Sequence, residues 1–350
     1  MQVNSITIHE WFNRHWHGRS GKILKIVLPW EIRQRATGAV AMGNLTHPNE
    51  TSTIEKATAY YQEILSSLPH GCDFKPRMTC YLTDAISPEE VVRGFEEDVW
   101  CAVKLYMANQ QGQGGTTGSQ HGVKNLLGRY PVFVAMEKKG IPLLGHFEAV
   151  EEDVDEFDRE IVSLERDLKP LLKAFPGLPV VFEHITDGRA ADFVAEANYN
   201  IQATATPHHL ARNRNAMFWG GMNPVEYCKP VFKRESHRLR VRKYVTSGNR
   251  RFGAGDDSAP WVEEAKSRCC GCAAGIFHTN SVEEYATVFD EDNALKHLGP
   301  FLSENFVGLY GMEVSSKKMT IERKPLLIPE KIGTVRVFKG GTYLSWKLVG

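Results

Sequence analysis

Short apolar runs, rich in β-branched residues, alternate along this chain with longer stretches in which apolar residues recur at helical spacing. The runs at 76–82 and 178–184 are typical of buried strands, and 23–27 is another apolar run. Residues 52–68 and 154–175 show helical spacing, and Ser87 and Pro88 form a typical helix start. Roughly eight such strand–helix pairs follow one another.

This alternation predicts an α/β fold built on a parallel sheet with helical crossovers. Eight strand–helix units that close on themselves form a (β/α)8 TIM barrel, which usually takes about 250 residues. The 350-residue chain therefore predicts one barrel domain over residues 1–350, with an N-terminal lead and a C-terminal extension over about 315–350. An open doubly wound sheet is the competing architecture, but the chain has no Gly-x-Gly-x-x-Gly motif after a first strand.

Composition and charge argue against several classes of function, binding to nucleic acid or to a membrane among them. Lys plus Arg and Asp plus Glu are equal at 42 each, so no basic field would attract nucleic acid or an anionic membrane. The sequence shows no signal peptide or transmembrane run, and its seven cysteines are not typical of a disulfide framework. We interpret Cys269, Cys270 and Cys272 as part of a loop, because a thiolate zinc site needs about four ligands at paired spacings. We expect a cytoplasmic protein that acts on a small molecule, and a homodimer is compatible with the sequence.

Residues that can bind metals recur at the ends of the predicted strands. His15 and His17 are two residues apart, so both imidazoles face the same side of a strand. In a parallel barrel the carboxyl ends of the strands meet at one mouth, where active sites lie. The residues that we expect to converge there are His15, His17, Lys104, His146, His184 and Asp257. Each alone is more simply explained as a structural histidine, an exposed lysine or a turn aspartate, but together they predict a metal centre.

Several motifs, found in a fixed order, resemble those of one family. They are MTCYLTD at 78–84, KLY at 104–106, PLLGH at 142–146, VVFEHIT at 180–186, NRN at 213–215, DSAP at 257–260, CGCA at 270–273 and YATVFD at 285–290. In these motifs the chain resembles the dihydroorotases of the bacterial and fungal monofunctional type, within the amidohydrolase superfamily. The resemblance implies a hydrolase of cyclic amides that interconverts N-carbamoyl-L-aspartate and L-dihydroorotate in pyrimidine biosynthesis.

The resemblance also implies two zinc ions per chain. The first would be bound by His15, His17 and Asp257, and the second by His146 and His184. Lys104, carboxylated by carbon dioxide, would bridge the two ions. Two such ions can activate a shared water molecule and polarise a carbonyl group. Asp257 would be the catalytic acid and base that carries the proton to the leaving nitrogen.

Substrate-binding residues follow from the same resemblance: Arg19, Asn44, Thr116, Thr117, Lys229, Trp261 and Ala273. Arg19 and Asn44 match residues that hold the substrate carboxylate, with Arg19 supplying a planar fork of donors. Thr116 and Thr117 stand in a loop at 109–121 that resembles the family's mobile lid. Lys229 and Ala273 align where the family uses backbone groups to hold the ring.

The chain departs from the family pattern at several positions. Ser20 and Gly43 stand where Asp and Pro are usual, and the loop at 109–121 is longer than the bacterial pattern. Trp261 stands where the family has a histidine that helps to bind the substrate carboxylate. This substitution leaves two alternatives open: a related binuclear metal hydrolase for another cyclic amide, and a non-catalytic dihydroorotase-like subunit. We favour a working dihydroorotase, because all six expected ligands are retained.

Overall fold

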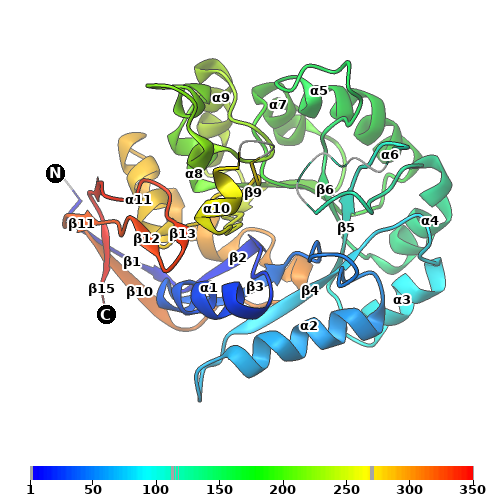
Figure 1. Cartoon of the computed structure of the whole chain (residues 1–350), viewed down its shortest axis with the longest axis horizontal. Coiled ribbons are helices and arrows are strands. Elements are labelled where there is room, and N and C mark those ends of the chain that lie inside the picture. The colour runs from blue at the N-terminus through cyan, green and yellow to red at the C-terminus, as the bar shows by residue number, and fades with distance from the viewer. Residues whose placement is uncertain (1–2, 112–113, 115, 117, 269–271, 350) are drawn as a thin grey trace.

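Eight parallel strands form the centre of the structure, a computed structural model that describes residues 3–111, 114, 116, 118–268 and 272–349 (Figure 1). These strands are β2 (Trp11–Trp16), β3 (Ala36–Ala41), β4 (Lys75–Tyr81), β5 (Ala102–Tyr106), β6 (Leu143–His146), β7 (Val180–Phe182), β8 (Ile201–Ala205) and β9 (Phe252–Ala254). Each strand pairs with the next one along the chain, from β2 to β9. A parallel bridge between Trp16 and Ser258 joins the two ends of the sheet. The predicted TIM barrel is therefore confirmed.

Helices connect the strands and cover the outside of the barrel (Figure 1). The α-helices are α1 (Gly21–Arg33), α2 (Ile54–Ser67), α3 (Pro88–Glu96), α4 (Tyr130–Lys139), α5 (Arg159–Ser163), α6 (Lys169–Ala174), α7 (Gly188–Glu196), α8 (Pro207–Ala211), α9 (Glu235–Thr246), α10 (Glu263–Lys266) and α11 (Ser281–Glu291). Shorter 3-10 or π segments are η1 (Leu127–Arg129), η2 (Leu164–Leu168), η3 (Arg214–Met217), η4 (Pro224–Glu226), η5 (Leu295–His297), η6 (Pro300–Glu304) and η7 (Val307–Tyr310). The π turn η2 lies between α5 and α6, within the stretch predicted as one long helix.

Local sequence explains where several helices begin. The Ser87 hydroxyl accepts the Glu90 amide at 3.2 Å, and Pro88 occupies the first turn of α3, as predicted. The apolar run at 23–27 lies inside α1. Its side chains follow helical spacing, and Leu24, Val27 and Leu28 form the buried face.

The N-terminal lead and the C-terminal segment lie side by side against one flank of the barrel (Figure 1). Strand β1 (Ser5–His9) pairs antiparallel with β10 (Lys318–Glu322), which also pairs with β15 (Lys347–Val349). Two short antiparallel pairs complete this region: β11 (Leu326–Leu327) with β14 (Tyr343–Leu344), and β12 (Lys331–Ile332) with β13 (Val335–Arg336). This pairing brings the two ends of the described chain close together in space, although they are far apart in the sequence.

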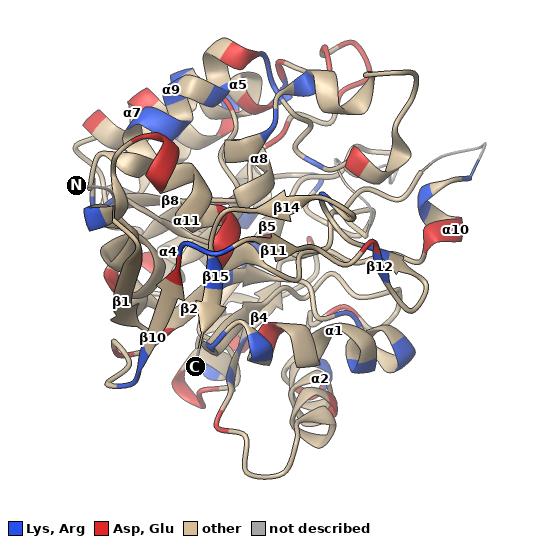
Figure 2. Ribbon diagram, turned by 90° about the vertical axis from the view of Figure 1, so that its left-hand side faces the viewer, with Lys and Arg blue, Asp and Glu red and all other residues tan. Residues whose placement is uncertain are grey.

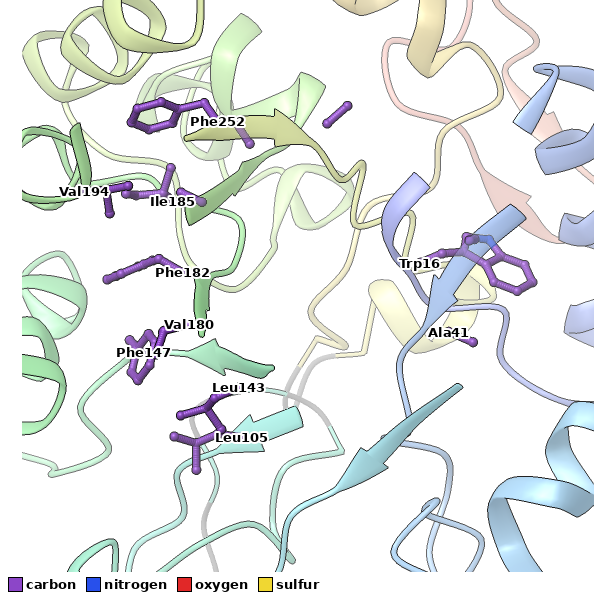
Figure 3. Packing of buried hydrophobic residues seen from close by; sticks show 14 of the residues in the cluster. Trp16, Ala41, Leu105, Leu143, Phe147, Val180, Phe182, Ile185, Val194 and Phe252 are labelled. Atoms are coloured by element: carbon purple, nitrogen blue, oxygen red, sulfur yellow. The ribbon is translucent and has the colours of Figure 1, made fainter. Parts of the chain in front are cut away.

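The apolar core lies mainly between the barrel and its helices, because alternate residues of each strand face opposite sides of the sheet. Leu105, Leu143 and Phe182, from three neighbouring strands, belong to this outer cluster (Figure 3). The residues beside them in sequence face the barrel interior, where Leu144 and Val181 pack in a separate cluster. Lys104 pairs with Leu144 in the sheet, and His146 follows Leu144 by two residues, so both side chains also face the barrel interior. On their own strands they lie nearer the mouth of the barrel than the residues of this inner cluster.

Arg14 closes the barrel interior below the mouth. Its guanidinium is fully buried and donates to the carbonyl oxygens of Asn305 at 2.7 and 2.9 Å and of Leu302 at 2.9 Å. The ring of Phe306 lies 5.0 Å from the guanidinium carbon. A buried cation is tolerated here because its donors meet several carbonyl oxygens. Arg14 therefore supports the structure beneath the two histidines that follow it.

Positions of Lys and Arg are interspersed with those of Asp and Glu along the ribbon in Figure 2. Among the described residues, no helix has both the length and the apolar character needed to span a membrane.

Candidate active site

The six expected ligands come from five strands and meet at the carboxyl end of the barrel. His15 lies at the end of β2 and His17 just beyond it, Lys104 lies in β5, and His146 is the last residue of β6. His184 follows β7 by two residues and Asp257 follows β9 by three. Two backbone bonds hold β2 and β9 together at this level, from the Asp257 amide to the His15 carbonyl (3.0 Å) and from the His17 amide to the Ser258 carbonyl (3.1 Å).

His15, His17 and Asp257 form one compact group. The Nε2 atoms of the two histidines are 3.2 Å apart. The Asp257 Oδ1 atom lies 3.3 Å from His15 Nε2 and 3.0 Å from His17 Nε2. All three side chains are buried, and their ligand atoms lie within 4.8 Å of one another. Two imidazole nitrogens and one carboxylate oxygen at this spacing are a donor set that suits zinc.

His146 and His184 form the second group. The His146 Nδ1 atom lies 2.9 Å from His184 Nε2, and both side chains are buried. The His184 ring is 5.0 Å from the His15 ring, so the two groups adjoin. Burial lowers the pKa of His146 and His184, and it lowers the pKa of His17 to about 3. Neutral imidazole is the form that binds metals.

Lys104 is fully buried and interacts electrostatically with His15, His146 and His184, which belong to these two groups. Among the described residues its Nζ atom has no hydrogen-bond partner, and the Tyr106 ring centre lies 5.0 Å away. Burial lowers the pKa of the Lys104 amine to about 8, although Glu183 and Asp257 favour the charged form. An amine with a pKa this far below that of a free lysine is deprotonated in part near neutral pH, and the deprotonated form has the free lone pair that a reaction with carbon dioxide requires.

Buried carboxylates contact His15 and His146 through the ring nitrogens that do not face the other expected ligands. Glu183 Oε2 lies 2.5 Å from His15 Nδ1 and accepts the Thr204 hydroxyl at 2.6 Å. Glu148 Oε2 lies 3.0 Å from His146 Nε2. Burial raises the pKa of the Glu148 carboxyl, but His146 outweighs burial and lowers it to about 2. Such partners fix the ring orientation and raise the basicity of a metal-binding histidine.

Sequence reasoning missed these supporting carboxylates. A usable signal was present, since Glu183 directly precedes His184 and Glu148 follows His146 by two residues. Asn13 and Asp256 were also missed. The Asn13 side-chain NH2 donates to Asp256 Oδ1 at 2.8 Å, and Asn13 Oδ1 accepts the backbone N–H of His15 at 3.2 Å.

Three residues of the site have a left-handed backbone. Arg19, His184 and Asp257 have φ angles of 55°, 40° and 48°. This conformation is unusual for residues other than glycine and is maintained only where the surroundings enforce it. It turns each side chain at the strand end, and in Asp257 it aims the carboxylate at His15 and His17.

Burial and the neighbouring histidines determine the protonation state of the Asp257 carboxyl group. Burial raises the pKa of its carboxyl, but the neighbouring His15 and His17 lower it well below its usual range. Asp257 is therefore an ionised acceptor at neutral pH.

A small pocket opens above the ligands. Its lining consists of His17, Arg19, Asn44, Tyr106, Thr116, His146, His184, Lys229, Asp257, Ala259, Ala274 and Gly275. Four of the expected substrate residues are among them: Arg19, Asn44, Thr116 and Lys229. Ala273 is not; its amide donates to the Ala265 carbonyl at 3.0 Å, and the next two residues line the pocket instead. Thr117 lies outside the described residues.

Trp261 lies beside the pocket and contacts Arg19. The Arg19 guanidinium carbon is 4.5 Å from the indole ring centre, and Arg19 Nε donates to the Pro260 carbonyl at 3.1 Å. The indole N–H donates to the Ala274 carbonyl at 2.9 Å. Because indole has only this one donor, Trp261 contributes a ring face to Arg19 and has no N–H left for a ligand.

Known proteins resemble this chain over nearly its whole length. A dihydroorotase of Sphingopyxis alaskensis is 45% identical over 99% of this chain and 100% of its own length. A dihydroorotase of Synechococcus sp. (strain CC9902) is 44% identical over 99% of this chain and 98% of its own length. The crystal structure of Saccharomyces cerevisiae dihydroorotase in complex with 5-fluoroorotic acid superposes with a TM-score of 0.90 at 28% identity, covering 99% of both chains. No protein-family model matches this chain.

Proposed function

The chain belongs to the dihydroorotase family, and we propose that the six residues at the barrel mouth hold the two metal ions that serve its reaction. That reaction is the reversible interconversion of N-carbamoyl-L-aspartate and L-dihydroorotate, a step of pyrimidine biosynthesis. It closes or opens a six-membered cyclic amide, so the protein is a cyclic amide hydrolase of the amidohydrolase superfamily.

The donor set fits a pair of zinc ions. His15, His17 and Asp257 would hold one ion, and His146 and His184 the other. Lys104 would bridge them as a carbamate, an anionic oxygen ligand formed when its neutral amine adds carbon dioxide. The observation that carries this proposal is the buried Lys104 side chain. Its Nζ atom has no hydrogen-bond partner among the described residues, burial lowers its pKa to about 8, and it interacts electrostatically with His15 and His146, one from each histidine group. When bound, two such ions would activate a water molecule and polarise the scissile carbonyl.

Asp257 would move the proton in this reaction. Its carboxylate is ionised at neutral pH, so it can accept a proton from the attacking water. It can then deliver that proton to the ring nitrogen as the amide bond breaks. In the closing direction the same carboxylate takes the proton from the nitrogen, as reversibility requires. Its left-handed backbone and its contacts with His15 and His17 support this role, because they hold the carboxylate in one position at the barrel mouth.

Arg19 and Asn44 would bind the substrate carboxylate at the pocket wall. Both line the pocket, and the Arg19 fork suits a carboxylate group. Trp261 would act on the substrate through Arg19, by holding the guanidinium against its ring face. This arrangement offers a physical account of how the chain functions without the family's histidine at this position.

A substrate panel tests the proposed function. The zinc-loaded enzyme is assayed with L-dihydroorotate, a hydantoin and a dihydropyrimidine that carries no carboxylate. We expect kcat/KM to be highest for L-dihydroorotate, and an Arg19→Ala variant to lose that preference, because the fork recognises the carboxylate. A higher kcat/KM for a ring without a carboxylate would favour the alternative of a related cyclic-amide hydrolase. Absence of turnover with every ring, in protein that retains its metals, would favour a non-catalytic subunit.

A further inference from the structure

A second group of metal-binding side chains lies outside the barrel mouth. His47 and Glu50 belong to the loop after β3, and His121 belongs to the loop after β5. Their ligand atoms lie within 4.8 Å of one another. His47 Nδ1 is 3.1 Å from Glu50 Oε1, and His121 Nε2 is 3.9 Å from the same oxygen. The two imidazole rings stack, with centres 4.0 Å apart and an angle of 21° between their planes.

We propose that His47, Glu50 and His121 form a third metal site, which takes Zn²⁺ or another borderline transition-metal ion and ties the two loops together. Two imidazoles and one carboxylate are a donor set found in zinc sites that keep an open position for water. The imidazoles favour ions of the zinc type over Mg²⁺ and Ca²⁺, which prefer oxygen ligands alone. This inference does not depend on the proposed function, since none of its ligands belongs to the barrel mouth.

The exposure of the three side chains suits an exchangeable ion. The Glu50 side chain is only 6% exposed, whereas those of His47 and His121 are 61% and 50% exposed. A nearly buried carboxylate thus faces two imidazoles that solvent can reach. An ion can enter from solvent and leave again without unfolding the chain.

Backbone bonds fix the ligands before an ion arrives. In the first loop the Thr51 amide donates to the Gly43 carbonyl at 3.0 Å, and the Asn49 amide donates to the Thr46 carbonyl at 2.9 Å. In the second loop the Gly122 amide donates to the Ser119 carbonyl at 3.0 Å. Immediately afterwards, Val123 pairs with β5 through its amide and the Tyr106 carbonyl at 2.8 Å. Ligands beside such backbone bonds lose little freedom on binding, so affinity does not require a large rearrangement.

The two loops also supply walls of the active-site pocket. Asn44 precedes His47 in the first loop, and Thr116 precedes His121 in the second; both line the pocket. The backbone of Gly118 already approaches the Asn44 carbonyl, where an added Cβ would lie 3.1 Å from that oxygen. An ion at His47, Glu50 and His121 would reinforce this contact from the outside. Occupancy would therefore resist separation of the two loops.

Zinc binding by the purified holoenzyme tests the site. Wild-type protein and the variants His47→Ala, Glu50→Gln and His70→Ala are dialysed against Zn²⁺, and bound zinc is counted per chain. We expect wild type to bind one zinc more than His47→Ala or Glu50→Gln. His70 is an exposed histidine that does not belong to this group, so His70→Ala should match wild type. Equal zinc content in wild type and His47→Ala would overturn the proposal, as would an equal loss in His70→Ala.

Hydrogen exchange tests the link between the loops without relying on activity. The amides of residues 118–123 should exchange more slowly in wild type when Zn²⁺ is added, and their exchange in His47→Ala should not change. Exchange that is the same with and without Zn²⁺ in wild type would overturn the proposed tie. His47→Ala should retain dihydroorotate turnover in both conditions, so loss of the third site is distinguished from loss of the catalytic metals.

Discussion

Removal of the Trp261 ring should weaken substrate binding through Arg19. The guanidinium carbon lies 4.5 Å from the indole centre, and burial lowers the pKa of Arg19 only to about 10, so the group stays charged at neutral pH. A cation over an aromatic face is worth about 0.5–1 kcal/mol when exposed and about 2 kcal/mol when desolvated. Arg19 is half-buried. We therefore expect Trp261→Ala to raise the KM for dihydroorotate by about 5–30-fold, with a smaller change in kcat.

Two further substitutions separate the contributions of this side chain. Trp261→Phe keeps a ring face and removes the N–H bond to the Ala274 carbonyl, which is worth about 1 kcal/mol, so its KM should rise less than that of Trp261→Ala. Trp261→His restores the donor that the family uses. A hydrogen bond to a charged group is worth about 1.5–3 kcal/mol, so the KM of Trp261→His should be about 10–100-fold below that of Trp261→Ala.

Initial rates of dihydroorotate hydrolysis, measured at several substrate concentrations, give both constants for each variant. Trp219→Ala is the matched control, because Trp219 is 84% exposed and does not line the pocket. It should leave KM unchanged. An unchanged KM in Trp261→Ala would refute the idea that the ring holds Arg19. Equal KM values in Trp261→Ala and Trp261→His would refute a donor role for the family's histidine in this pocket.

The remaining predictions concern the proposed metal centre. Asp257→Asn should lower kcat by at least about 10²–10⁴-fold through loss of the proton carrier; metal content is measured in parallel, and near-normal turnover with metal bound would show that another group carries the proton. Glu183→Gln should weaken zinc binding by about 10–100-fold, because His15 loses its anionic partner; a chelator titration measures this, and an unchanged affinity would contradict it. Reconstitution of the chelated enzyme with zinc and bicarbonate should accelerate as the pH rises through about 8, where the Lys104 amine becomes neutral; a pH-independent rate would count against carboxylation of that amine.

The sequence was sufficient to predict the barrel and the convergence of its ligands, because both depend on patterns along the chain. Parallel strands bring their carboxyl ends to one mouth, so His146 and His184 could be placed together from their positions after apolar runs. The metal-binding role remains a prediction, although the structure brings these residues to the expected place. The run at 23–27 could not be assigned to a helix from the sequence, because a short apolar segment does not by itself distinguish a helix from a strand.

The contacts of Trp261 with Arg19 and of Glu50 with the histidine of the loop after β5 could not be predicted, because each joins segments that are distant in the sequence. The Trp261 ring contacts the Arg19 guanidinium, and its indole N–H donates to the Ala274 carbonyl. Glu50 gains its two imidazoles only when the loops after β3 and β5 pack together. The left-handed backbone of His184 likewise follows from its tertiary surroundings rather than from its residue type.

Metal analysis combined with turnover shows whether the barrel mouth holds a catalytic pair of metal ions, and the His47→Ala background restricts the count to that site. Protein with an intact Lys104 should hold two divalent ions per chain and should lose both the ions and dihydroorotate turnover on chelation. Lys104→Ala should fail to hold the pair tightly and should lack activity, whereas Lys124→Ala, at an exposed lysine, should behave as its parent. A fully active enzyme without metal, or a Lys104→Ala variant that retains both ions and turnover, would contradict the account.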